Sequence, residues 1–250
     1  LPINVLTIIF SSITFKQSQA QVAREIQNTL NMAGDTLAST LETSVRQLSY
    51  LSVSNTDFSV VASKSQMEDK PSRFYTSYAN VGVALDNVIS SFDQLDVVYF
   101  VFPETGYLVS RGYPGLVYRE YRNVLESMPE KSVQEDKTWE YMEIGGVSVL
   151  VSHDSWHNMD FGVVLNLERT LNKLNLPEAS EGSVFFFTNN DEDLFTESGR
   201  DLFFSTGLNL SGIEGASRFH VYRCPLEKYD LTLIQVVDEQ YYTVTIPAVL

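Results

Sequence analysis

The stretch RGYPGLVYREYR places three arginines among three tyrosines, in a chain whose formal net charge is −15. Arginine forks bind carboxylate and phosphate groups in bidentate fashion, and aromatic rings line many small-molecule pockets. The stretch therefore predicts a site for a sugar or for a ligand with a carboxylate or phosphate group. The alternative is a solvated helix face on which the arginines pair with neighbouring glutamates. The candidate residues are Ser110, Arg111, Tyr113, Tyr118, Tyr121 and Arg122.

Two further aromatic residues, Trp139 and Tyr141, alternate with glutamates in TWEYMEI. Because strand side chains alternate between the two faces of a sheet, both rings point to the same side of their strand. Such a pair either stacks on a ligand or fills the core. We keep both residues as candidate ligand contacts.

The loop HDSWHNMD contains His153, Asp154 and His157. Imidazole and carboxylate groups are ligands for transition metals. The loop has no third firm ligand, however, and its spacing matches no zinc signature. We therefore expect no metal, and we interpret His153 and Asp154 as residues at the rim of a ligand pocket.

The sequence contains no motif that indicates catalysis or cofactor binding. G-x-S-x-G, G-x-x-x-x-G-K-[ST], G-x-G-x-x-G and H-E-x-x-H are all absent. A pair of catalytic carboxylates, as in a glycosidase, stays open as an alternative because carboxylates are plentiful. The negative charge argues against a nucleic-acid partner, since binding to phosphates needs a basic surface.

A long helix is expected over residues 16–54. Apolar side chains recur there every three or four residues, which is the period of one helical face, and no proline interrupts them. This apolar stripe either packs along the domains that follow or pairs with a second copy of the chain. Its members are Val22, Ile26, Leu30, Ala33, Leu37, Leu41, Val45, Leu48 and Leu51.

An α+β module is expected over residues 66–176, after a polar link. Pro71 opens a helix; LDVVYFVF and YLVS then form one hairpin, and TWEYMEI and VSVLVS form another. Gly145-Gly146 between the last two is a strong hairpin signal, because glycine tolerates positive φ. FGVVLNL adds a fifth strand before the helix ERTLNKL, and residues 117–128 between the hairpins have helical period.

A second, smaller module is expected over residues 177–239. SVFFFT and LFTES flank the turn NNDED, and RFHVYRC and DLTLIQVVD follow. Runs of this kind, bounded by turn residues, are typical of strands. The pattern predicts a four-stranded antiparallel sheet.

Both ends of the chain are apolar. Residues 1–15 contain no charge, and residues 240–250 begin beside paired tyrosines, a residue type enriched at membrane interfaces. A membrane helix needs about 20 apolar residues, so neither end would span a bilayer alone. We interpret residues 1–15 as the remnant of a first transmembrane helix and residues 240–250 as the start of a second.

This layout resembles the extracellular double Cache sensor domains, in which two PAS-like modules lie along one long N-terminal helix. LDVVYFVFPETGYLVSRG is similar to the first hairpin of the membrane-distal module. RQLSYLSVSNTDF is similar to the helix end in sensor histidine kinases and membrane-bound AraC-type regulators of Gram-positive bacteria. The resemblance covers residues 17–238 and implies an α+β fold, with a stalk helix and two antiparallel-sheet modules.

The resemblance further implies an extracellular-facing, small-molecule-sensing domain of a membrane receptor. The ligand would lie between residues 111–128 and the strands at 138–144 and 147–152. Amino-acid-binding members carry an arginine close before a Trp-Tyr pair, whereas Trp139 is followed here by Glu140, so recognition by that motif is not expected.

The implied receptor is a homodimer that is joined to the membrane by its flanking helices. Its output would be a histidine kinase or, as second choice, an AraC-type DNA-binding domain. Two other functions stay open: a membrane-tethered hydrolase and a structural module without a ligand.

Overall fold

The computed structural model describes residues 2–64, 67, 71–102, 107–112, 122–123, 139–156, 159–174, 176, 182–189 and 195–239. The chain divides into two compact units, and helix α1 contributes to both. The smaller unit, which we call unit B, contains residues 1–35, 175–226 and 231–250. The larger unit, unit A, contains residues 36–174 and 227–230.

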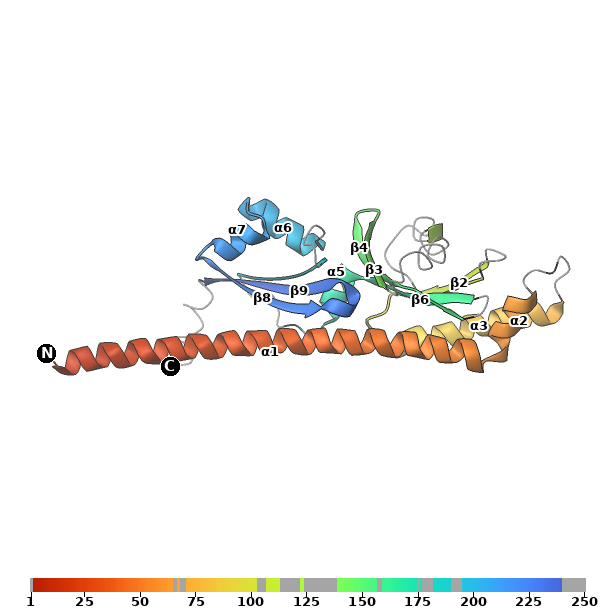
Figure 1. Cartoon of the computed structure of the whole chain (residues 1–250), viewed down its shortest axis with the longest axis horizontal. Coiled ribbons are helices and arrows are strands. Elements are labelled where there is room, and N and C mark those ends of the chain that lie inside the picture. The colour runs from red at the N-terminus through yellow and green to blue at the C-terminus, as the bar shows by residue number, and fades with distance from the viewer. Residues whose placement is uncertain are drawn as a thin grey trace. The chain divides into compact units, whose positions relative to one another are not determined.

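Helix α1 runs without a break over Pro2–Ser54 (Figure 1). The expected stripe is the buried side of this helix: Leu30, Leu37, Leu41 and Leu48 have no exposed surface. The stripe therefore packs within its own chain, which was one of the two arrangements expected. Among the described residues, no helix combines the length and the apolar character needed to cross a membrane.

Unit A contains an antiparallel sheet, sheet A, in the order β2-β1-β6-β4-β3, with the short strand β5 paired to β6. Both predicted hairpins and the predicted fifth strand are present. Gly145 and Gly146 adopt φ of 57° and 82° in the turn between β3 and β4. The strands are β1 (Val97–Phe102), β2 (Tyr107–Gly112), β3 (Trp139–Ile144), β4 (Val147–Ser152), β5 (Asp154–Trp156) and β6 (Met159–Asn166).

Two helices pack on one face of sheet A through aromatic rings. The ring of Phe58, on α2 (Thr56–Lys64), lies 4.4 Å from that of Phe100, which stacks on Phe161 at 5.1 Å. Phe74, on α3 (Ser72–Ser91), meets Tyr107 of β2 edge-on. Helix α3 follows Pro71 as predicted, but α2 lies where we expected only a polar link. Its nine residues include only the two buried side chains Phe58 and Val61, too few for a clear period.

A buried carboxylate fixes the junction between β6 and helix α5 (Leu167–Lys173). Asp96, just before β1, accepts a 2.7 Å hydrogen bond from the backbone N–H of Asn166. Its side chain has no exposed surface and pairs with Arg169 at 3.0 Å and Lys173 at 3.3 Å. Because removing one partner of a buried pair is costly, this contact holds α5 against the start of β1.

Unit B contains the three-stranded antiparallel sheet B, in the order β7-β9-β8. The prediction of a fourth strand at LFTES is wrong. Phe195 forms only an isolated bridge to Thr188, and a helix begins at Glu197. The hydroxyl of Thr196 accepts the backbone N–H of Phe187, which replaces a further ladder bond. The elements are β7 (Ser183–Asn189), α6 (Glu197–Thr206), α7 (Leu210–Gly215), β8 (Phe219–Leu226) and β9 (Leu231–Asp238), and the 3-10 turn η1 (Glu227–Tyr229) belongs to unit A.

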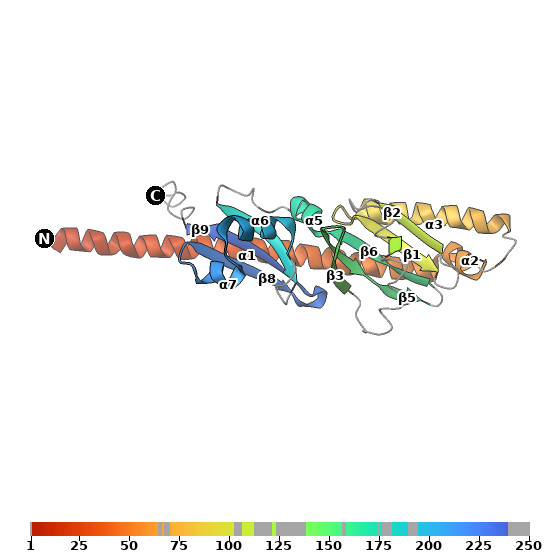
Figure 2. The ribbon, with the colours of Figure 1, turned by 90° about the horizontal axis from the view of Figure 1, so that it is seen from above.

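Sheet B has helices on both faces (Figures 1 and 2). Helices α6 and α7 lie over one face, while α1 covers the other, where Val22 and Ile26 pack against Val237. Gly34 allows a close approach of α1 to β8: a Cβ atom there would clash with the sulfur of Cys224. The only cysteine of the chain is thus a buried packing residue, as its strand-like sequence suggested.

We expect Gly34→Ala to destabilise unit B. Alanine gains about 1 kcal/mol of helix propensity, but overpacking at Cys224 costs about 1 to 3 kcal/mol. Cys224→Ala in the same chain removes the clash, so the double variant should be at least about 1 kcal/mol more stable than the sum of the single effects predicts. Urea unfolding of the four proteins measures this coupling, and additive effects would contradict the packing described here.

Candidate functional site

The structure places six of the ten predicted site residues on or beside strands of sheet A. Ser110 and Arg111 lie on β2, Trp139 and Tyr141 on β3, His153 between β4 and β5, and Asp154 at the start of β5. Arg122 is helical and is one of the two described residues at 122–123. Tyr113, Tyr118 and Tyr121 lie outside the described residues, as do His157 and most of the expected cover over residues 111–128.

Arg111 is engaged with helix α3. Its Nε lies 3.3 Å from the carboxylate of Asp86, and its Nη1 donates to the carbonyl of Ser110 at 2.9 Å. The guanidinium fills the space beside Gly82, where a Cβ atom would clash with it. Strands β2 and β3 are opposite edges of sheet A, so the structure does not bring Arg111 near Trp139.

Trp139 is largely a packing residue. It is 7% exposed, and its ring meets that of Tyr229 edge-on at 5.0 Å. The Tyr229 hydroxyl donates to the carbonyl of Ala38 on α1 at 3.0 Å. On the same side of β3, Tyr141 donates its hydroxyl to Ser148 at 3.2 Å.

Three of the predicted residues do meet in one pocket of about 300 Å³, which we call the sheet A pocket. Its size lies at the lower end of the range for small-molecule sites. One wall is a single stretch of α1 and the other is the edge of sheet A. The lining residues are Glu42, Val45, Arg46, Ser49, Trp139, His153, Asp154 and Lys228.

Two cations share one carboxylate at the mouth of this pocket. Arg46 Nη2 lies 3.1 Å and Lys228 Nζ lies 4.0 Å from the same oxygen, Glu42 Oε1. All three side chains are more than half exposed. Exposed pairs of this kind contribute only about 0.2 to 1 kcal/mol each, so another anionic group can replace Glu42 at little cost.

A polar cluster is buried in sheet A close to the pocket. His153 Nε2 lies 3.5 Å from Asp160 Oδ1, a distance too long for a hydrogen bond. Neither ring nitrogen of His153 has a hydrogen-bond partner among the described residues, although the side chain is only 3% exposed. Buried polar groups are almost always paired, so an unpaired histidine of this kind is typical of a functional site, of a strained position or of a bound water.

The ring of Tyr99 crosses strand β6 where that strand has no side chain. Tyr99 is paired with Gly162, and its hydroxyl donates to the carbonyl of Ser152 at 2.6 Å. A Cβ atom at Gly162 would clash with that same carbonyl oxygen. The glycine therefore allows the bridge from β1 to the end of β4.

Burial shifts the pKa values of the cluster toward neutral side chains. It raises the pKa of Asp160 to about 6 and lowers that of His153, although the charge of Asp154 opposes the second shift. The pKa of Tyr99 is raised, mainly by burial and further by the charge of Asp160. At neutral pH the cluster therefore contains one carboxylate, held without a strong partner. No three potential metal ligands gather anywhere in the described part of the chain.

Sequence reasoning missed Asp160, Tyr99, Glu42, Arg46 and Lys228. Asp160 did carry a signal, because an aspartate within the apolar strand MDFGVVLNL is unusual. Glu42 and Arg46 carried a weak signal as an i,i+4 pair on the predicted helix. Tyr99 and Lys228 carried none, since their roles depend on neighbours far away in the sequence.

Comparisons with solved structures identify the fold. The extracellular domain of vpHK1S-Z8, assigned as a histidine kinase, superposes with a TM-score of 0.55 at 10% identity, covering 91% of this chain and 98% of that one. The corresponding domain of soHK1S-Z6 gives 0.52 at 11% identity, covering 93% and 99%. The sensory domain of the Campylobacter jejuni chemoreceptor Tlp3 gives 0.51 at 12% identity, also covering 93% and 99%.

The chain has the fold of these sensor domains. The expected fold class, a long N-terminal helix with antiparallel-sheet modules, is thereby confirmed. Comparison with family models and with curated proteins finds no match.

We expect Asp160→Asn to stabilise the chain at neutral pH. Asp160 has a higher pKa in the folded state, about 6, than its ordinary value of 3.8, so its contribution to stability is lost as pH rises through that window. The neutral amide does not titrate, and at pH 7 it should raise the unfolding free energy by about 1 to 3 kcal/mol.

The two proteins should converge as the pH falls toward 4, where the carboxyl is protonated. Urea unfolding at pH 4.5, 5.5, 6.5 and 7.5 measures the difference. A constant difference across this range would contradict a raised pKa for Asp160.

Proposed function

We propose that the chain is the ligand-sensing domain of a membrane receptor, facing the outside of the cell, and that its ligand binds in the sheet A pocket. The fold supports this proposal, because the solved structures that share it are sensor domains. The observation that carries it is the composition of the pocket. One wall belongs to α1 and the other to the edge of sheet A, so a bound molecule touches both.

The ligand that this pocket suits is a small molecule with a carboxylate or phosphate group. Arg46 and Lys228 already converge on the carboxylate of Glu42, so the incoming group would take the place of an anion that is weakly held. A guanidinium fork and an ammonium group are the usual protein partners of such anions. A sugar is the less suitable candidate, because the ring of Trp139 is buried against Tyr229 and offers little face for stacking.

The signal follows from a difference in affinity between two arrangements of α1 and sheet A. In the empty state, Glu42 pairs with the two cations. In the bound state, the ligand bridges those cations to the edge of the sheet near His153 and Asp154. A ligand shifts the equilibrium only by its differential affinity for the two states, so replacement of Glu42 is the step that couples binding to the helix.

The complete receptor, in this proposal, is joined to the membrane by helices flanking the chain and signals through a cytoplasmic histidine kinase. It acts as a homodimer, and the chain itself performs no catalysis. Because the stripe of α1 packs within its own chain, a dimer along this helix would use another face. Tyr50 and Val53 on α1 are 69% and 57% exposed and suit that role.

A membrane-tethered hydrolase is the second candidate, and the raised pKa of Asp160 is the observation that favours it. A general acid needs such a pKa, but it must also reach its substrate. Asp160 is 7% exposed and does not line the sheet A pocket. Sensing therefore fits the geometry better.

We expect carboxylates or phosphate to bind the chain and Arg46→Ala to weaken that binding at least tenfold. A hydrogen bond to a charged group contributes about 1.5 to 3 kcal/mol. The measurement is isothermal titration calorimetry with succinate, inorganic phosphate and glucose, together with the thermal shift that each one causes.

Arg24→Ala is the matched control, because Arg24 is an exposed arginine on the same helix outside the pocket. It should leave the affinity unchanged. Binding of glucose alone, equal effects of the two arginine variants, or the absence of binding by all three probes would each contradict the proposed ligand class.

A further inference from the structure

A short turn separates helices α6 and α7, which both lie over one face of sheet B. Helix α6 ends at Gly207, whose φ of 67° is a left-handed conformation that glycine adopts without strain. Two residues later, the side chain of Asn209 caps α7 by accepting the backbone N–H of Gly212 at 2.8 Å. Because α6 ends and α7 begins at this turn, part of sheet B between the two helices is left uncovered.

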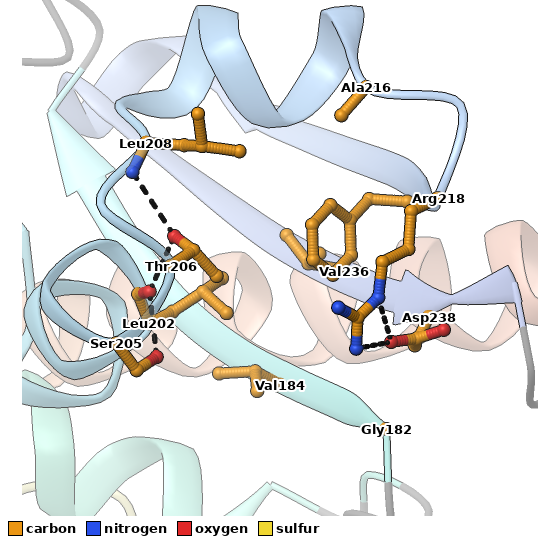
Figure 3. Close-up of a pocket in the computed structure, with 11 residues that line it drawn as sticks. Gly182, Val184, Leu202, Ser205, Thr206, Leu208, Ala216, Arg218, Val236 and Asp238 are labelled. Atoms are coloured by element: carbon orange, nitrogen blue, oxygen red, sulfur yellow. Dashed lines mark hydrogen bonds and ion pairs between the residues drawn. The ribbon is translucent and has the colours of Figure 1, made fainter.

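The uncovered end is a pocket of about 530 Å³, which we call the sheet B pocket (Figure 3). Its floor is apolar: Val184 and Val236 pair across β7 and β9, and the ring of Phe219 lies beside them on β8. Leu202 of α6 and Leu208 of the turn form the facing wall. A pocket of this size that is mostly apolar is typical of small-molecule sites.

One charged pair closes the pocket on the side away from α6 (Figure 3). Arg218 Nε and Nη2 both lie on the same oxygen of Asp238, at 2.8 and 2.7 Å. Nη1 of Arg218 has no hydrogen-bond partner among the described residues, so it is available as a donor. The pair as a whole is neutral, and no other lining residue is ionisable.

We propose that the sheet B pocket is a second binding site, for an uncharged molecule with an apolar body and one carbonyl group. The apolar body would lie on Val184, Val236 and Phe219, while the carbonyl oxygen accepts a hydrogen bond from Arg218 Nη1. A carboxylate would be attracted by Arg218 but repelled by Asp238, and an ammonium group the reverse, so neither charge gains a net attraction from the pair. The neutral pair therefore selects for a neutral ligand.

This site is independent of the sheet A pocket. All its lining residues belong to unit B, whereas the sheet A pocket belongs to unit A. It also touches the end of β9: the Asp238 backbone N–H donates to Gly182 at 2.7 Å, and the next N–H donates to Arg218 at 2.7 Å. A ligand on Arg218 would thus help to hold the end of β9, the central strand of sheet B, in place.

The test uses the complete 250-residue chain and three probes that share one ring: benzamide, benzoate and benzylamine. Titrations are followed by NMR of isotope-labelled methyl groups, with Val184 and Val236 as reporters. We expect a Kd on the order of 1 mM for benzamide, which is well within the ceiling on binding free energy per non-hydrogen atom. We expect benzamide to bind at least fivefold more tightly than either charged probe.

Three variants locate the site. Ala216→Phe fills the pocket and should abolish binding of benzamide, whereas Ser217→Phe, at the adjacent exposed position outside the lining, should not. Arg218→Lys keeps the positive charge beside Asp238 but lacks the Nη1 donor of the guanidinium group. It should weaken binding of benzamide three- to tenfold. Circular dichroism of each variant confirms that it is folded.

Three results would overturn the proposal: no shift of the two valine reporters with benzamide, tighter binding of benzoate than of benzamide, or unchanged binding in Ala216→Phe. Because these measurements do not involve Arg46 or Lys228, their failure would leave the proposed function of unit A untouched.

Discussion

One stripe of apolar side chains on α1 is the constraint on which both units depend. Sheet B has apolar residues on both faces, and β9 is buried along its whole length, so a cover on each face is required. Helices α6 and α7 cover one face and α1 covers the other through Val22 and Ile26. In unit A, the same stripe continues as Leu37, Leu41 and Leu48, all fully buried. Without α1, neither unit would have a complete core.

The elements predicted well were those with long, regular patterns. The stripe of α1, the period of α3 after Pro71 and the alternation around Gly145-Gly146 are local signals, and each element forms where its pattern indicated. The failures were short segments decided by tertiary contacts. The segment LFTES has strand-like composition, but Thr196 bonds to β7 through its hydroxyl, and Gly199 packs directly on Phe186, so the chain turns into α6. Helix α2 is only nine residues long and buries two side chains, too few for a period to be visible.

The candidate site was harder to predict because it depends on residues far apart in the sequence. Residue types alone drew attention to His153 and Asp154, although Asp154 begins β5 where we expected a loop, and strand alternation drew attention to Trp139. Glu42 and Lys228, which line the same pocket, come from α1 and η1, and nothing near either residue in the sequence indicates a pocket. Arg111 was conspicuous in an acidic chain, yet α3 supplies Asp86 as its partner. Composition thus identifies charged residues that need partners but does not say which partners the fold supplies.

The contact between Gly34 and Cys224 gives the chain a natural reporter of local opening. Cys224 is the only thiol, it is 6% exposed, and burial together with the charge of Asp35 raises its pKa. The thiolate is the form that attacks an alkylating reagent, so the closed form reacts slowly for two reasons, access and protonation. Reaction then requires α1 to lift from sheet B, and its rate measures the population of that open form. The labelling rate of Cys224 in the unmodified protein therefore reports the stability of the contact between α1 and sheet B.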